Sequence, residues 1–409
     1  MTKSVEQAKV VIIGGGILGA SIAYHYTRRF PGRVIVLERN TLASAASSRA
    51  AALLTRARQK AALMPLIAQT YADIADLELQ LHESLDLRQV GSLHVAASRQ
   101  REQELRDLVT LAAAAEIAVE WLQAGEAVKR APWLAVDTVQ VIASMPEDGF
   151  IDPYRLATAY ARAARAQGAE LRQHTAVLEI LREGQRIVGI RTDQGNITTD
   201  WVVDAAGAWA VALAAQAGVA LPVAPVRSQY WITAPHPLFP RDHSSVILPD
   251  ANAYSRPELG ALLFGLRETP SVSVDARALP TDLDGCDLSP DNGWPSLAEG
   301  AAALGHFLPI LPELEIRHYI AGLSTYTPDG LFVLGAVPAI PGFLAATGCC
   351  GAGIAAAGGI GASIAALTAG RPAPWDLTPF RPERFGAVDP FSTEFRRRCE
   401  QARSFKISG

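Results

Sequence analysis

Three closely spaced glycines near the start of the chain are typical of a loop that binds a dinucleotide. An apolar run, VVII, leads into Gly14, Gly16 and Gly19, with Ile17 and Leu18 between them. An unbroken apolar run suits a strand that is buried on both faces of a parallel sheet. The glycines allow a tight turn, close approach of the backbone to a pyrophosphate, and close packing of the following helix. The N–H groups at the start of that helix would face the phosphate.

An acidic residue follows the next candidate strand, which reads RVIVL at residues 33–37. A carboxylate at Glu38 can accept hydrogen bonds from an adenosine ribose, and its charge disfavours a 2′-phosphate. The strand, the glycines and the acid together predict a dinucleotide site in a Rossmann-like βαβ unit at about residues 9–38. Glycine turns also occur in α/β cores that bind nothing, and the residues alone leave FAD and NAD both open.

The composition is that of a folded enzyme. The 409 residues are enough for two domains. Hydrophobic residues make up 49% and charged residues 19%, which argues against disorder. The net charge of −4 gives no basic field, so we expect no nucleic-acid partner. Cys286, Cys349, Cys350 and Cys399 lack CxxC spacing, so we expect neither a metal site nor a disulfide framework.

One stretch resembles a membrane span. Residues 344–370 carry no charge and are long enough to cross a bilayer. The stretch contains many glycines, which favours a buried glycine-rich helix, so we expect no membrane span. The first residues, MTKSVEQAK, are polar and lead directly into the first strand, which indicates a cytoplasmic protein.

Hydrophobic periodicity predicts the remaining elements. Helices are expected at 64–85, 99–115 and 154–167, the last with Asp152 as its N-cap and Pro153 at its first position. Strands are expected at 89–96, 170–173, 201–204, 226–233, 245–248 and 260–265, with a β-hairpin at 177–198. The Ser/Ala-rich residues 39–55 are either a segment whose small side chains admit a ligand or an alanine-rich helix.

Several segments, in this order, resemble the FAD-dependent amine and amino-acid oxidoreductases of the D-amino-acid oxidase type. That family includes glycine oxidase, sarcosine oxidase and dimethylglycine dehydrogenase. The segments are residues 14–19 with Glu38, 91–93, 148–153, 204–209, 254–265, 322–335 and 348–361, so the resemblance covers nearly the whole chain.

The resemblance implies an α/β fold, with a Rossmann-like FAD-binding domain and an interleaved antiparallel β-sheet substrate domain. It implies FAD rather than NAD, and non-covalent binding, because the family's attachment residues are replaced by Arg49 and Gly322. The expected FAD-binding domain is 1–90, 146–221 and 322–385, the substrate domain is 91–145 and 222–321, and 386–409 form a tail. That tail is either a solvated end or a docking segment for a partner.

Matching the family's motifs residue by residue gives an expected set of cofactor contacts. These are Gly14, Gly16, Ile17, Leu18, Gly19, Glu38, Arg39, Ser47, Ser48, Arg49, Ala50, Val177, Ala206, Gly207, Trp209, Gly322, Gly348, Cys349, Cys350, Gly351, Ala352, Gly353 and Ile354. The glycine loop at 348–353 is expected to open a helix whose N-terminus faces the flavin, or else to allow close helix packing. The adjacent cysteines in this loop are either redox-active or simply small and buried.

The family chemistry implies hydride transfer from the amine's α-carbon to flavin N5, followed by hydrolysis of the imine. Tyr254, Arg256 and Tyr326 are the residues expected beside the substrate. Glycine oxidase-like members clamp the substrate carboxylate with the arginine of a Gly-Leu-Arg-Pro motif, which reads Gly-Leu-Ser-Thr here at residues 322–325. Either Arg256, or Arg56 or Arg58, replaces that arginine, or the substrate is not a simple α-amino acid.

A lysine that sarcosine oxidases use with oxygen is replaced by Leu263, so we expect poor reaction with oxygen and another, unknown electron acceptor. The resulting hypothesis is an FAD-dependent dehydrogenase that oxidises a C–N bond in a secondary or tertiary amino acid or related amine. Sarcosine-, dimethylglycine- and proline-like compounds are the expected substrates. The alternatives are a D-amino-acid dehydrogenase acting on primary amines, or a flavin-carrying subunit of a hetero-oligomer without turnover of its own. A homo-oligomer also stays open.

Overall fold

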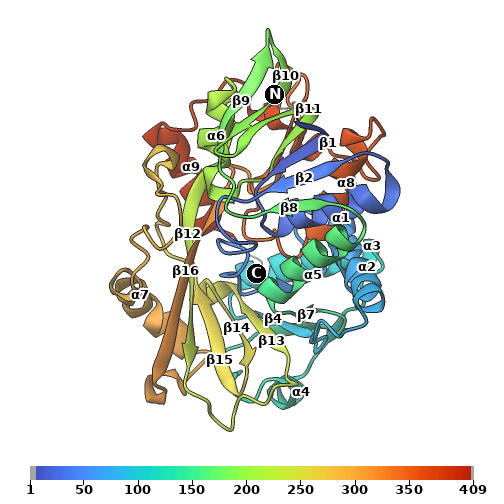
Figure 1. Ribbon diagram of the computed structural model, residues 1–409. Coiled ribbons are helices and arrows are strands. Elements are labelled where there is room, and N and C mark those ends of the chain that lie inside the picture. Colours follow the sequence, from blue (N-terminus) through green and yellow to red (C-terminus); the bar gives the residue numbers. More distant parts are fainter. Residues whose placement is uncertain (1–5, 407–409) are drawn as a thin grey trace.

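The computed structural model describes residues 6–406 and contains two large β-sheets, with most helices packed around the first (Figure 1). In the first sheet the order is β17-β18-β11-β1-β2-β8, and the hairpin β9–β10 joins β11. Its strands are β1 (Glu6–Ile13), β2 (Val34–Leu37), β8 (Glu170–Arg172), β9 (Val177–Glu183), β10 (Arg186–Thr192), β11 (Gly195–Asp204), β17 (Val333–Ala336) and β18 (Phe343–Thr347). The neighbours β8, β2, β1, β11 and β18 run parallel.

The apolar run in β1 is buried on both faces, as its sequence indicates. Val10 and Ile12 belong to the core on the helical side, whereas Val11 and Ile13 belong to the core on the opposite side. A parallel sheet covered on both faces requires this continuous apolar pattern.

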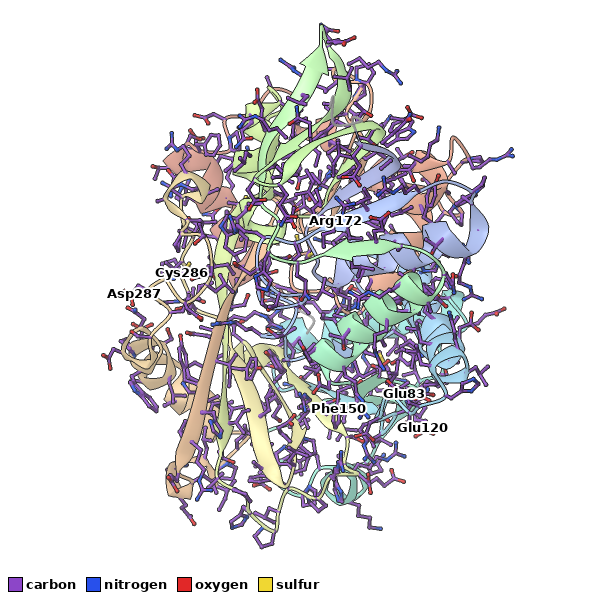
Figure 2. All side chains as sticks on the ribbon, in the orientation of Figure 1. Glu83, Glu120, Phe150, Arg172, Cys286 and Asp287 are labelled. Atoms are coloured by element: carbon purple, nitrogen blue, oxygen red, sulfur yellow. The ribbon has the colours of Figure 1, made fainter. Side chains whose placement is uncertain are left out.

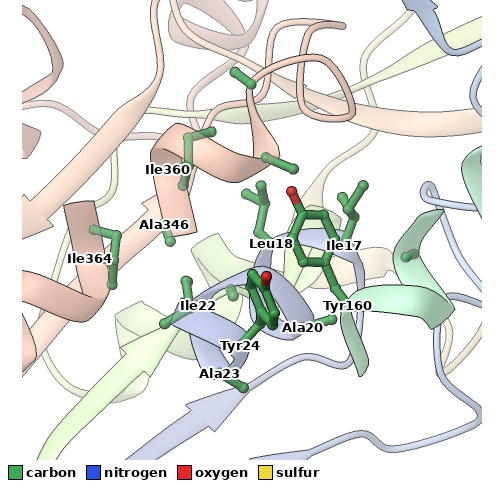
Figure 3. Close-up of a cluster of buried hydrophobic side chains, with 14 of the residues drawn as sticks. Ile17, Leu18, Ala20, Ile22, Ala23, Tyr24, Tyr160, Ala346, Ile360 and Ile364 are labelled. Carbon is green, nitrogen blue, oxygen red and sulfur yellow. The ribbon is translucent and has the colours of Figure 1, made fainter. Parts of the chain in front are cut away.

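Four helices cover the first face of this sheet. They are α1 (Ile17–Arg29), α2 (Met64–Leu81), α5 (Pro153–Ala166) and α8 (Ala357–Thr368). Figure 3 shows Ile22 of α1 facing Ile360 and Ile364 of α8, with Tyr160 of α5 on the other side. The helix α6 (Ala210–Gln216) packs on the opposite face.

The second sheet is mostly antiparallel, in the order β16-β12-β15-β14-β13-β4-β6-β5. Its strands are β4 (Ser92–Ala96), β5 (Glu120–Trp121), β6 (Val141–Met145), β12 (Ala224–Thr233), β13 (Ser245–Leu248), β14 (Ala253–Glu258), β15 (Ala261–Leu266) and β16 (Ile316–Tyr326). The helices α3 (Arg99–Ala114), α4 (Ala124–Arg130) and α7 (Trp294–Gly305) pack around it, while α9 (Thr393–Ser404) lies against β12 and β16. A short pair, β3 (Leu53–Leu54) with β7 (Gly149–Phe150), completes the strands.

The predicted α/β fold class and the main helices are confirmed. Asp152 caps α5, since its Oδ1 accepts a hydrogen bond of 2.9 Å from the Arg155 N–H, and Pro153 is the first helical residue. The predicted helix 64–85 ends earlier, at Leu81, because His82 adopts a left-handed conformation with φ 53°.

Three details of the predicted organisation differ. The alanine-rich helix considered for residues 39–55 is wrong, because this segment consists of turns followed by β3. The second half of the predicted hairpin and the strand at 201–204 are one continuous strand, β11. The predicted domain boundary at residue 322 falls inside β16, which pairs with β12 as far as Tyr326. The other domain limits stay a prediction.

The uncharged stretch 344–370 is a strand, a loop and a short helix within the core. Among the residues described, no helix is long and apolar enough to cross a membrane. In α8 the glycines face neighbouring backbones: a Cβ on Gly359 would lie 2.2 Å from the Leu66 Cα, and one on Gly361 would lie 2.1 Å from the Ser21 Oγ. The glycines therefore set how closely α8 packs against α2 and α1.

This packing predicts a large effect of a single methyl group. Gly359→Ala would force α8 away from the Leu66 backbone, so we expect a loss of about 2 kcal/mol or more in the free energy of unfolding. Gly125→Ala in α4 is the matched control, because its Cβ would meet no atom within 4 Å. Thermal unfolding of both variants measures the difference, and equal midpoints would contradict the packing argument.

Candidate functional site

The glycine turn after β1 has the geometry that its sequence predicts. Gly14 has φ 108°, and a Cβ there would lie 2.4 Å from the Ala205 carbonyl oxygen. A Cβ on Gly19 would lie 1.9 Å from the Gly14 oxygen, so the helix packs directly on the turn. At Gly16 a Cβ would meet only the Ser47 Oγ, at 3.1 Å. Gly16 therefore has more room than Gly14 and Gly19, because its one close neighbour is the end of a side chain and not the backbone.

Glu38 connects the end of β2 to this turn. Its Oε2 accepts a 2.8 Å hydrogen bond from the Gly15 N–H, and its Oε1 accepts one of 2.8 Å from the Asn40 N–H. The carboxylate is half-buried and lines the groove described next. A structural role for Glu38 is therefore visible, and its contact with a ribose stays a prediction.

A groove of about 480 Å³ crosses the carboxyl ends of the parallel strands. This volume is within the range of roughly 300–1,000 Å³ typical of small-molecule and cofactor sites. Its lining includes Gly14, Gly16, Ile17, Leu18, Glu38, Arg39, Ser47, Arg49, Val177, Ala206, Gly207, Trp209 and Cys349. The guanidinium of Arg39 lies 4.8 Å from the centre of the Trp209 ring, which brings two distant predicted residues together. In open α/β sheets, this edge is where ligands bind.

A second cavity, of about 170 Å³, adjoins the groove and shares Ile17, Ser47, Arg49 and Cys349 with it. The other predicted residues in its wall are Ala50, Tyr254, Gly322, Tyr326, Gly351, Ala352, Gly353 and Ile354. The second sheet contributes Tyr254 on β14 and Tyr326 on β16, whereas residues 351–354 belong to the loop after β18 of the first sheet. Desolvation raises the pKa of both tyrosines, so their hydroxyl groups stay protonated near neutral pH.

The glycine loop is attached to β16 through Thr325. The Thr325 Oγ1 accepts hydrogen bonds from the Gly348 N–H at 3.0 Å and the Cys349 N–H at 3.1 Å. The helix predicted to open at this loop begins only at Ala357, after a series of turns. Desolvation raises the pKa of Cys349 to about 12 and also raises that of Cys350, which favours protonated thiols over redox-active thiolates.

Four predicted cofactor residues lie outside both cavities. Gly19 packs on the turn, and Gly348 is bonded to Thr325. The Ser48 hydroxyl donates to the Ala45 carbonyl oxygen, while the Cys350 thiol lies 3.5 Å from the Thr327 hydroxyl. These four residues support the segments that form the two cavities, but they are not exposed in either cavity.

Arg256 also lies outside the cavities. Its Nε donates to the Ala51 carbonyl oxygen at 3.0 Å, and its guanidinium is paired with Glu258. The guanidinium also lies 4.6 Å from the centre of the ring of Phe150, a residue of β7 that Figure 2 labels. The structure therefore gives Arg256 structural partners. Arg56 and Arg58 do not line either cavity.

The second cavity contains cations that the sequence did not reveal. They are Arg267 after β15, Arg403 in α9, and Lys406. The prediction of a solvated tail is therefore wrong for α9, where Phe395, Cys399 and Arg403 are buried. These three residues are spaced four apart, so they lie on one face of a helix. That spacing is the sequence pattern that indicates a buried helix here.

No group of three or more His, Cys, Asp or Glu side chains within residues 6–406 could hold a metal ion. Cys286, labelled in Figure 2, lies on the segment between β15 and α7, two residues after Asp284, which lines the groove. The residues present fit an FAD, because an open glycine turn, a long groove and a second cavity follow one another along the sheet edge.

Gly16 allows the groove to be tested with a smaller effect on the fold than the other glycines of the turn, because an added Cβ would press only on the Ser47 Oγ, at 3.1 Å. In Gly16→Ala the added methyl group would stand where the pyrophosphate should approach the turn, so we expect FAD affinity to fall by about tenfold or more. Thermal unfolding of the protein without cofactor should change less than in Gly359→Ala. Gly125→Ala is again the control, and undiminished flavin binding by Gly16→Ala would contradict the predicted pyrophosphate position.

Asp204, at the end of β11, predicts a pH-dependent stability. Burial raises its pKa from 3.8 to about 7. The unfolded chain loses this proton near pH 4, whereas the folded protein keeps it until about pH 7, so stability falls between these values. Asp204→Asn removes this loss of stability. The thermal midpoint of the variant minus that of the unsubstituted protein should therefore be larger at pH 8 than at pH 4.5. The exposed Asp137→Asn should show no such widening, and a constant difference for Asp204→Asn would contradict the prediction.

Comparison with known proteins places this geometry in a family. A family model described as "FAD dependent oxidoreductase" matches residues 9–367. The chain is 30% identical to 4-methylaminobutanoate oxidase (formaldehyde-forming) of Paenarthrobacter nicotinovorans over 87% of its own length and 43% of that protein. It is 30% identical to mouse mitochondrial sarcosine dehydrogenase over 89% of its own length and 40% of that protein. The chain therefore spans less than half of these two relatives.

Relatives of similar length also exist. The glycine oxidase of Geobacillus kaustophilus is 30% identical over 91% of this chain and 95% of its own. Its crystal structure superposes with a TM-score of 0.78 at 28% identity, covering 93% of this chain and 99% of that one. The L-proline dehydrogenase of P. horikoshii shares the fold, with a TM-score of 0.83 at 24% identity over 93% and 98% of the two chains. The chain therefore belongs to the D-amino-acid oxidase type of FAD-dependent oxidoreductases, whose members act on amines and amino acids.

Proposed function

We propose that the protein oxidises a C–N bond in a secondary or tertiary amino acid or related amine, with sarcosine-, dimethylglycine- or proline-like compounds as substrates. The observation that carries this proposal is the second cavity. Residues 351–353 form one part of its wall, and Tyr254 and Tyr326 form another. Two similar proteins, 4-methylaminobutanoate oxidase and sarcosine dehydrogenase, add support, because both are named for N-methyl substrates.

The chemistry that FAD supplies when bound is acceptance of hydride from the substrate. The substrate's α-C–H bond breaks as the nitrogen lone pair forms a C=N bond. Water then cleaves the imine into an amine and a carbonyl compound. The residues of this chain position the substrate. The protonated hydroxyls of Tyr254 and Tyr326 can hydrogen-bond its carboxylate or amine. Leu266 and Ile354 contribute apolar walls that limit the access of water.

Anaerobic flavin reduction tests the proposal. The purified protein loaded with FAD should lose its yellow absorbance when sarcosine, N,N-dimethylglycine or L-proline is added, and more slowly with D-alanine. Tyr254→Phe removes one hydroxyl, so the reduction rate divided by the dissociation constant should fall by about tenfold. Tyr154→Phe, on the exposed side of α5, is the matched control.

The same measurement separates the alternatives. Preferential bleaching by D-alanine would favour a D-amino-acid dehydrogenase acting on primary amines. Bound flavin that no amine reduces would favour a flavin-carrying subunit, which would overturn the proposal.

We also propose that the enzyme is a dehydrogenase rather than an oxidase. Leu263 is buried in β15 opposite Arg256 and two residues from Gly265, which pairs with Tyr254. It thus lies on the sheet face that carries Tyr254 and Arg256, and it is an apolar side chain at the position that a lysine occupies in sarcosine oxidases. Reduced protein exposed to air should regain its yellow colour slowly. Rapid, stoichiometric peroxide formation would contradict this proposal.

A further inference from the structure

A short segment between the two sheets reaches the groove from the far side. The chain between β15 and α7 contributes Asp282, Leu283 and Asp284 to the lining of the groove. Most of the remaining lining comes from the first sheet and the loops that follow its strands. We call residues 280–285 the clasp. They form neither a helix nor a strand, and Cys286 follows them directly (Figure 2).

The clasp is bonded to the loops on both sides of the glycine turn. Asn40, after β2, donates from its Nδ2 to the Thr281 carbonyl oxygen at 3.1 Å. Trp209, after β11, donates from its Nε1 to the Pro280 carbonyl oxygen at 2.7 Å. In the sheet, β1 lies between β2 and β11. The loops that flank the glycine turn are therefore joined through the clasp beyond the end of β1.

The same two loops also contact each other. The guanidinium of Arg39, which lies 4.8 Å from the centre of the Trp209 ring, is half-buried. Desolvation lowers the pKa of Arg39, against the opposite effects of Glu38 and of Asp282 in the clasp. The Asp282 carboxylate is therefore close to this guanidinium. Contacts from three segments thus meet over one part of the groove.

One apolar side chain fastens the clasp to the protein. Leu283 is 4% exposed and packs with Ala208 and Leu323, whereas the residues on either side of it in the chain are exposed. Arg49 also forms an ion pair of 3.0 Å with Asp284. The Asp284 side chain is 89% exposed, so this pair contributes little to holding the clasp. The packing of Leu283 is therefore the main interaction that has to break when the clasp lifts.

The clasp should open more easily than the floor of the groove. The floor follows strands whose side chains are buried in the two large cores on the faces of the first sheet. Such strands open only when the whole protein unfolds, whereas a surface segment with one buried apolar side chain can open by itself.

We propose that the clasp is a gate for the cofactor, which has to open before FAD can enter or leave the groove. Leu283 sets how often it opens. The inference goes beyond the proposed function, because it concerns the exchange of FAD and not the amine that is oxidised. A closed gate blocks entry and release equally, so it slows exchange without changing the affinity for FAD.

The rate of cofactor exchange tests the gate. Exchange of bound FAD for isotopically labelled FAD measures the release rate of the loaded protein, and a fluorescence titration measures the dissociation constant. Leu283→Ala removes most of the packing that keeps the clasp closed, so we expect exchange to be about tenfold faster or more. The dissociation constant should change by less than about twofold, because association is accelerated by the same factor. Asn40→Ala loses the hydrogen bond to Thr281 and should accelerate exchange by about threefold.

Leu259→Ala is the matched control, because Leu259 is 72% exposed in the turn between β14 and β15; both quantities should stay unchanged. An unchanged exchange rate in Leu283→Ala would overturn the inference. Faster exchange with an equal weakening of binding would also overturn it, because Leu283 would then be a direct contact of FAD and not part of a gate. If Leu283→Ala fails to fold, Asn40→Ala decides by the same two criteria. Exchange requires no substrate, so failure of the gate leaves the proposed reaction intact, and a protein whose flavin no amine reduces can still show the gate.

Discussion

Close approach of backbone to backbone is the constraint on which the rest of this structure depends. Gly14 lets the turn after β1 pass the Ala205 carbonyl, and Gly19 lets α1 pack directly on that turn. Gly359 in α8 similarly admits the backbone of α2. Because these contacts fix the helices against the sheet, the start of α1 lines the groove with Gly16, Ile17 and Leu18. A single Cβ at such a contact would displace a whole element.

The groove results from this arrangement of helices on the first sheet. The second cavity is formed where residues of the second sheet meet the loops of the first. Parallel strands end together at one edge, so Ile13, Glu38 and Ala206 line the same groove although they come from three different strands or the residues after them. The second sheet then brings Tyr254 and Tyr326 to the adjoining cavity. Thr325, in β16, holds the glycine loop that follows β18, so this loop and Tyr326 are fixed by one strand. The shape of the second cavity thus depends on β16 as well as on the dinucleotide fold.

Electrostatics distinguishes the two cavities. The groove carries acidic side chains, including Glu38 and Asp282, as well as Arg39, whereas the second cavity carries cations and no described carboxylate. Charges of one sign tolerate burial only when a ligand or an ordered set of dipoles compensates them. The hydroxyls of Ser228 and Ser271 supply such dipoles to Arg403 in part.

The sequence by itself determined the α/β class, the glycine turn, Glu38 at the end of β2 and the capped helix α5, because each depends on residues close together in the chain. The family and its FAD also followed from local motifs. Only the tertiary structure decided that Arg256 is held by Ala51 and Glu258, and that α9 is buried rather than solvated. It alone brought Arg403 and Lys406 to a cavity otherwise walled by residues far away in the sequence. Local periodicity specifies which face of a helix is buried, but the position of that face depends on long-range packing that no short motif encodes.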